Sequence, residues 1–121
     1  MIEPDGARPQ VFAYYKRLQR VKEHLDTHLS DKISLKTAAE IAGLEEKYFS
    51  TFFHTKTGIC FTEWVTRVRI HRAMEIMRAR NHTITQVALA VGFEDLRTFE
   101  RAFKRCTGLT PWAFKRSVRP S

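Results

Sequence analysis

The chain has 121 residues, enough for one compact unit or two small lobes with modest apolar cores, and leaves no room for a separate ligand-sensing domain. Its formal net charge of +8 favours an acidic partner, either nucleic acid or an anionic membrane. A membrane is the weaker alternative, because no apolar run approaches the roughly 20 residues that span a bilayer. The N-terminus carries no export signal pattern, which favours a cytoplasmic protein.

Residues 1–10 contain two prolines and a glycine, and are expected to be a disordered lead or the scar of a truncation, in which case the native protein is longer. From residue 11 to 29, apolar residues recur at helical spacing and predict one helix of about five turns. His24 and His28 lie one turn apart, which is a metal-ligand spacing. No third ligand accompanies them, so we interpret them as a solvent-facing pair and expect no metal and no cofactor.

Residues 83–111 combine two amphipathic helical patterns with a tight turn and a basic face. Gly92 follows the first apolar stripe, where a left-handed residue would end a helix. The next helix is expected to start near Glu94 or Asp95, because a carboxylate suits a helix N-terminus. Its core face carries Phe99, Ala102, Phe103 and Cys106. Its opposite face presents three cations, as a recognition helix does, although a basic face alone is more often a solvated surface: Arg97, Arg101 and Lys104.

The same pattern occurs one repeat earlier, in residues 34–61, and this second copy favours a function over a solvated surface. The offset is 49 residues before the turn and 50 after it, so the second turn is one residue longer or differently shaped. Two copies are too few for a solenoid, and the turns favour duplicated helix-turn-helix units. The groove-facing equivalents in the first copy are less cationic: Lys47, Thr51 and His54. The matched pairs are Ala39 and Ala88, Gly43 and Gly92, Phe49 and Phe99, Phe53 and Phe103, and Thr57-Gly58 and Thr107-Gly108.

Residues 61–80 predict a long helix with two offset apolar groups, as a connector between two units requires. About 19 helical residues span roughly 28 Å, close to the roughly 34 Å between successive major grooves on one side of B-DNA. The expected organisation is an N-terminal helix-turn-helix subdomain over 11–60, the connector over 61–80 and a C-terminal helix-turn-helix subdomain over 81–121. This is an all-α, homeodomain-like architecture of about seven helices.

Three further features concern the ends of elements and the core. We expect the first helix of each helix-turn-helix to have an N-cap, at Ser34 in the first unit and at Thr83 or Thr85 in the second. Thr110 and Pro111 predict the start of a last short helix. Trp64 and Trp112 are interpreted as core anchors, and Cys60 and Cys106, which lack a CxxC spacing, as reduced thiols.

Residues 34–115 resemble the DNA-binding domain of the AraC/XylS family of bacterial transcription regulators. The stretch from Ile84 to Phe114 is similar to the family's signature, and Arg69, Ile70 and Ala73 match its middle helix. The chain departs from the family pattern at three places. Cys60-Phe61 stands where the family usually has Ser or Thr followed by Pro. Thr51 stands where an Arg is common, and Arg97-Thr98 stands where Ser-Tyr is common. The signature positions that agree are Gly92-Phe93, Phe99, Phe103-Lys104, Gly108 and Thr110-Pro111.

The resemblance implies two recognition helices that enter adjacent major grooves. The base-facing positions carried over are Lys47, Ser50, Thr51 and His54 in the first unit and Leu96, Arg97, Thr98 and Arg101 in the second. Leu96 would meet a thymine methyl, or else pack beside the cap. Helix starts and nearby cations are expected to lie against phosphates, which free N–H groups and positive charge favour: Ser34, Lys36, Lys56, Arg69, Thr83, Thr85, Lys104 and Arg105.

The resulting hypothesis is a sequence-specific regulator of transcription that binds double-stranded DNA as a monomer in the bacterial cytoplasm, associated with the nucleoid. The resemblance also implies activation through contact with RNA polymerase, and a native protein that dimerises if an N-terminal domain is missing. The alternative is a basic architectural module that binds nucleic acid without reading sequence. An enzyme is not expected, because no nucleophile elbow, paired carboxylates or glycine-rich phosphate loop occurs.

Overall fold

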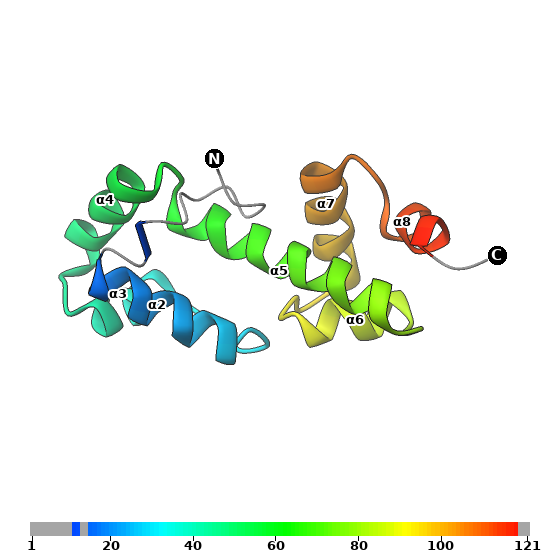
Figure 1. Cartoon of the computed structure of the whole chain (residues 1–121), viewed down its shortest axis with the longest axis horizontal. Helices are drawn as coiled ribbons and strands as arrows, with labels where there is room; N and C mark the ends of the chain where they lie inside the picture. The colour runs from blue at the N-terminus through cyan, green and yellow to red at the C-terminus, as the bar shows by residue number, and fades with distance from the viewer. Residues whose placement is uncertain (1–10, 13–14, 119–121) are drawn as a thin grey trace. The chain divides into compact units, whose positions relative to one another are not determined.

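The computed structural model describes residues 11–12 and 15–118, and no strand occurs in this part of the chain. The disordered lead predicted for residues 1–10 falls outside the described residues. The all-α architecture with two helix-turn-helix motifs is confirmed. Within residues 15–118 seven helices follow one another: α2 (Lys16–Thr27), α3 (Leu35–Ala42), α4 (Glu46–Thr57), α5 (Phe61–Ala79), α6 (Ile84–Ala90), α7 (Leu96–Thr107) and α8 (Pro111–Val118) (Figure 1).

The chain divides into two compact units, residues 1–68 and 69–121. The division falls inside α5, which covers nearly the whole segment predicted as a connector. The first unit therefore contains α2, α3, α4 and the start of α5, and the second contains the rest of α5 with α6, α7 and α8. Each unit holds one helix-turn-helix, formed by α3 and α4 in the first and by α6 and α7 in the second.

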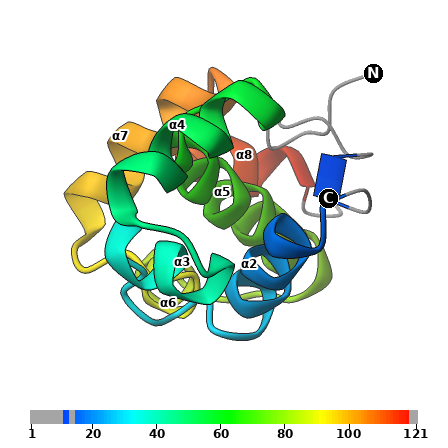
Figure 2. The same cartoon turned by 90° about the vertical axis from the view of Figure 1, so that its left-hand side faces the viewer.

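The core of the first unit is built around Trp64 on α5, which is fully buried. Its indole ring lies 5.2 Å from the ring of Phe53 and 5.3 Å from the ring of Phe12, measured between centroids. Phe49 and Phe61 complete this aromatic cluster. Figure 2 shows α2 and α3 side by side, with α4 leaving the turn that follows α3. The prediction that Trp64 anchors a core is confirmed.

The second unit has its own aromatic row, in which Phe99 and Phe103 on α7 are fully buried. Phe93 contacts Phe99, and Phe103 contacts Phe114 on α8, with ring centroids 5.2 and 5.5 Å apart. The prediction for Trp112 is wrong, because its side chain is 44% exposed. The reason is helical spacing: α8 buries Pro111 and Phe114, three residues apart, and the residue after Pro111 therefore points away from the core.

The predicted single helix from residue 11 to 29 is also wrong. Tyr15 has an extended backbone, with φ −102° and ψ 109°, and α2 begins only at Lys16. The break lets two aromatic residues that are close in sequence contact different partners: Phe12 packs on Trp64, whereas Tyr15 packs edge-on against Phe52 at 5.8 Å. At the other end, the rings of His24 and His28 stack 4.2 Å apart.

The two turns share one hydrogen-bond pattern, as the repeat predicts. Gly43 and Gly92 both have positive φ, at 73° and 99°, which only glycine adopts without strain. The residue after each glycine donates its N–H to a carbonyl five residues earlier, from Leu44 to Ala39 and from Phe93 to Ala88. The N-cap comes next in the first turn, as Glu45, but the second turn inserts Glu94 before its N-cap. The second turn is therefore one residue longer.

The repeated Thr-Gly pairs end α4 and α7 in the same way. The hydroxyl of Thr57 donates to the carbonyl of Phe53 at 2.7 Å and accepts from the N–H of Ile59 at 3.3 Å. Thr107 makes the equivalent bonds to Phe103 at 2.8 Å and from Leu109 at 3.1 Å. Each hydroxyl thereby satisfies a carbonyl at the end of the helix and a donor in the loop beyond it. The loops that lead into α5 and α8 are fixed by this motif.

Candidate nucleic-acid interface

The helix α7 presents its polar face to solvent because its core face is fixed by Phe99, Ala102 and Phe103, which are buried. The three predicted cations of this helix are all exposed: Arg97, Arg101 and Lys104. Residues three and four apart project from the same side of a helix, so these charges form one surface. Such a face matches the phosphate and guanine acceptors that line a major groove.

The start of α7 is held by Asp95. Its Oδ1 atom accepts the N–H of Thr98 at 2.7 Å, and its Oδ2 atom accepts the hydroxyl of Thr98 at 3.0 Å. One carboxylate therefore caps the helix and orients a side chain that the sequence predicts to face a base. Leu96, the first residue of α7, is half-buried, and Arg97 beside it is exposed.

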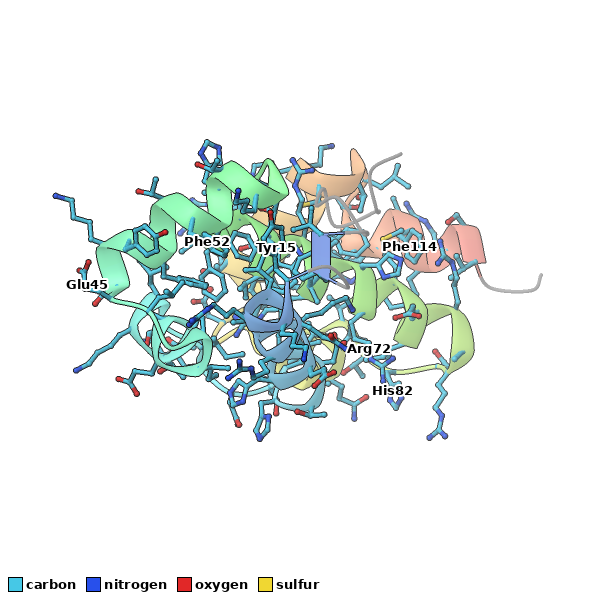
Figure 3. The ribbon with its side chains drawn as sticks, turned by 60° about the vertical axis from the view of Figure 1, so that its left-hand side comes forward. Tyr15, Glu45, Phe52, Arg72, His82 and Phe114 are labelled. Carbon is cyan, nitrogen blue, oxygen red and sulfur yellow. The ribbon has the colours of Figure 1, made fainter. Side chains whose placement is uncertain are left out.

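The helix α4 presents the equivalent face in the first unit. Glu45 caps it by accepting the N–H groups of Lys47 at 3.0 Å and Tyr48 at 3.3 Å, and its side chain marks the start of the helix in Figure 3. Two carboxylates, Glu45 and Glu46, lie at this end, as Glu94 and Asp95 do at the start of α7, but α4 carries fewer cations than α7. The four predicted base-facing residues are all exposed: Lys47, Ser50, Thr51 and His54.

The helix starts expected at phosphates are capped as predicted. Ser34 Oγ accepts the N–H of Thr37 at 3.0 Å. Thr83, rather than Thr85, caps α6, and it forms a capping box in which Gln86 bonds back to the N–H of Thr83 at 2.9 Å. These caps hold the first helix of each motif in position. Both threonines are exposed, and so are three of the cations expected at phosphates, Lys36, Lys104 and Arg105, whereas Lys56 is half-buried.

Two of these cations lie in settings that the sequence pattern does not predict. The ammonium group of Lys56 lies over the ring of Tyr15, 5.4 Å from its centroid, which is a cation–π contact. The guanidinium of Arg69 is half-buried on α5, and burial lowers its pKa. Both side chains are therefore packed in part against the protein and exposed in part to solvent.

The sequence reasoning missed Tyr48, which is 58% exposed on α4. The repeat could have found it: because Phe49 matches Phe99, Tyr48 occupies the position of Thr98, which is a predicted base-facing residue. It also missed Arg17, whose Nη1 donates to the carbonyl of Ala42 at 2.6 Å. That bond ties α2 to the end of α3, next to the turn. The side chains of Tyr15 and Phe52, which line the same region as Tyr48, are labelled in Figure 3.

Asp95 gives the second unit a pH dependence with a defined sign. Hydrogen bonds from the Thr98 backbone and side chain hold the pKa of Asp95 below its ordinary value, and the charge of Arg101 acts in the same direction. A lowered folded-state pKa means that this carboxylate stabilises the fold fully above its unfolded pKa, near 3.8, and loses that contribution as the pH falls through the lower folded value.

We therefore expect the stability difference between the native chain and Asp95→Asn to shrink as the pH falls from 6 to about 2. Urea unfolding followed by circular dichroism at several pH values measures it. Thr98→Val is the matched control, because it removes the side-chain bond and keeps the backbone bond, and it should reduce the pH dependence only in part. A difference that stays constant over this range would contradict the role assigned to the cap.

Comparison with known proteins identifies the class that these two motifs define. The family model of the helix-turn-helix domain matches residues 38–117. The HTH-type transcriptional regulator YobQ of Bacillus subtilis (strain 168) is 30% identical over 95 residues, which are 78% of this chain and 39% of YobQ. The chain thus spans about two fifths of that relative's length. No helix in the described residues is long and apolar enough to cross a membrane.

Solved structures share the fold. The C-terminal domain of AraT, a response regulator from Geobacillus stearothermophilus, has a TM-score of 0.81 at 25% identity, covering 87% of this chain and 88% of that one. The DNA-binding domain of AdpA, solved in complex with a target DNA, also has a TM-score of 0.81, at 23% identity and with coverage of 85% and 93%. The class is a DNA-binding domain with two helix-turn-helix units. The chain belongs to the AraC/XylS family of transcription regulators.

Proposed function

We propose that this chain binds a specific double-stranded DNA sequence and regulates transcription, with α4 and α7 as its recognition helices. The observation that carries the proposal is the exposed face of Arg97, Arg101 and Lys104 on a helix that is capped at Asp95 and fixed on a phenylalanine core. Arginine pairs with guanine through two hydrogen bonds, which requires a side chain that a rigid helix holds in register.

The two units support different parts of the binding. In α7, Arg97, Thr98 and Arg101 read base edges, Leu96 contacts a thymine methyl, and Lys104 and Arg105 contact phosphates. In α4, the reading set is Lys47, Ser50, Thr51 and His54, which offers hydroxyl and imidazole groups and less charge. The capped starts of α3 and α6, at Ser34 and Thr83, lie against the phosphate backbone of the DNA. The further residues that contact phosphates are Lys36, Lys56, Arg69 and Thr85.

The presence of one exposed recognition helix in each unit, α4 and α7, supports binding by a monomer to two successive major grooves. The AdpA domain, which shares this fold, was solved on a target DNA. Family membership further supports action in the bacterial cytoplasm as an activator in contact with RNA polymerase.

The experiment is selection of bound duplexes from a random pool by the purified chain. We expect two short conserved boxes about one helical turn apart, bound by one chain. Binding of the selected duplex should also fall steeply with salt, with a log–log slope of roughly −5 to −8 for about six to nine neutralised phosphates. A pool that stays random while the salt dependence persists would support the architectural alternative instead.

A further inference from the structure

A pocket of about 630 Å³ opens between the end of α5 and α6, within the second unit. This volume lies in the range of small-molecule sites, roughly 300–1,000 Å³. Four apolar side chains contribute to its lining: Ile76 and Ala79 from α5, and Val87 and Ala90 from α6. They can accommodate an apolar body of a few carbon atoms.

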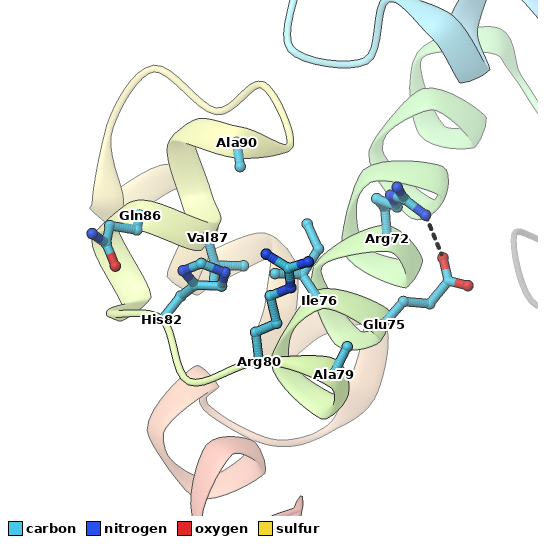
Figure 4. A pocket seen from close by; sticks show the side chains of 9 residues that line it. All are labelled: Arg72, Glu75, Ile76, Ala79, Arg80, His82, Gln86, Val87 and Ala90. Carbon is cyan, nitrogen blue, oxygen red and sulfur yellow. Dashed lines mark ion pairs between the residues drawn. The ribbon is translucent and has the colours of Figure 1, made fainter.

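An arginine and a histidine lie beside this apolar surface. Figure 4 shows Arg80 and His82 between the ribbons of α5 and α6, close to Ile76 and Val87. The carboxylate that lines the pocket, Glu75, is already paired: its Oε1 lies 3.6 Å from Nη1 of Arg72 and 3.8 Å from Nδ1 of His71.

Among the described residues, Arg80 makes no ion pair and no side-chain hydrogen bond. A guanidinium offers five donors in a planar fork, which matches the two oxygens of a carboxylate. Arg72, the other arginine on the lining, forms an ion pair with Glu75. The pocket therefore combines apolar side chains with the guanidinium of Arg80, which has no ion-pair partner among the described residues. Its complement is an amphipathic anion.

We propose that this pocket binds a small organic anion, with an apolar body against Ile76, Ala79, Val87 and Ala90 and a carboxylate on Arg80. His82, on the same connection between α5 and α6, offers a second donor to the same oxygens. The site is separate from the exposed cations of α7 and goes beyond the proposed DNA-binding function. Because α6 forms one wall, the ligand contacts the first helix of the second helix-turn-helix directly.

The test is a titration of the full chain with 3-phenylpropanoate, followed by the chemical shifts of the backbone amides and made without DNA. A ligand of this size is expected to bind with a Kd on the order of 1 mM. The shifts should be confined to residues 72–90, and the uncharged 3-phenylpropanamide should bind at least tenfold more weakly. Equal affinity for the acid and the amide would overturn the proposal.

Two variants separate the charged and apolar parts. Arg80→Gln should weaken 3-phenylpropanoate at least tenfold, and Ala90→Leu, which fills the pocket from an exposed position, should abolish its binding. Arg116→Gln, on α8, removes the same charge from an exposed site outside the pocket and should leave the affinity within twofold.

Inorganic phosphate distinguishes an organic-anion site from a surface that attracts any anion. We expect phosphate to bind at least tenfold more weakly than 3-phenylpropanoate. If phosphate binds equally well, or if Ala90→Leu has no effect while Arg116→Gln weakens binding as much as Arg80→Gln, the proposal is overturned in favour of non-specific charge attraction. All three variants change exposed side chains, so their melting temperatures should stay close to that of the native chain.

Discussion

Arg101→Ala is expected to weaken binding of the selected duplex by about 1–3 kcal/mol, or roughly 5- to 150-fold, the value of one bidentate arginine–guanine contact. Lys47→Ala should cost less, because the predicted base-facing residues of α4 carry fewer positive charges than those of α7. Fluorescence anisotropy of a labelled duplex at fixed salt measures both losses.

Arg116→Ala supplies the charge-matched control for this comparison. It removes one exposed cation from α8, outside both recognition helices, and should lower affinity only through the general electrostatic term. Equal losses for Arg101→Ala and Lys47→Ala would contradict the predicted asymmetry between the two units. A loss for Arg116→Ala as large as that for Arg101→Ala would mean that charge alone, and not base contact, accounts for the effect.

Trp64→Ala is expected to destabilise the first unit by about 3–5 kcal/mol, the usual cost of removing a large aromatic side chain from a core. Trp64 is fully buried and contacts the rings of Phe12, Phe53 and Phe61. A small domain has only about 5–15 kcal/mol of stability in total, so this unit would become marginal. Urea unfolding followed by far-UV circular dichroism measures the change.

The second tryptophan is the matched control. Trp112 is 44% exposed, so Trp112→Ala should change the free energy of unfolding by less than about 1 kcal/mol. If the two substitutions cost the same, the assignment of Trp64 to the core and Trp112 to the surface would be wrong. The comparison also corrects the sequence-based expectation that both tryptophans are buried.

The features that could be predicted from the sequence are those set by local chemistry and by the repeat. Gly92 at a left-handed turn and the matched Thr-Gly pairs follow from residue type at a fixed spacing, and so do the caps, which the sequence narrows to Glu94 or Asp95 and to Thr83 or Thr85. The exposed face of α7 follows as well, because its phenylalanines determine which side packs inward.

The features that could not be predicted depend on contacts between elements. The apolar period of residues 11–29 continues through Tyr15, so nothing local marks the break, which arises because Phe12 and Tyr15 pack on different partners. Trp112 has the apolar character of a core residue, but it lies on the face of α8 that is exposed to solvent. The bond from Arg17 to Ala42 joins residues 25 positions apart, a distance at which no sequence pattern operates.

The central claim is that both recognition helices read DNA, each its own box. The most direct measurement repeats the random-duplex selection with two double variants. One combines Lys47→Ala and His54→Ala in α4, and the other combines Arg97→Ala and Arg101→Ala in α7. We expect each variant to lose sequence preference in one box and to keep it in the other. Two boxes that both survive, or that both disappear with either variant, would contradict an account in which α4 and α7 read separate parts of the site.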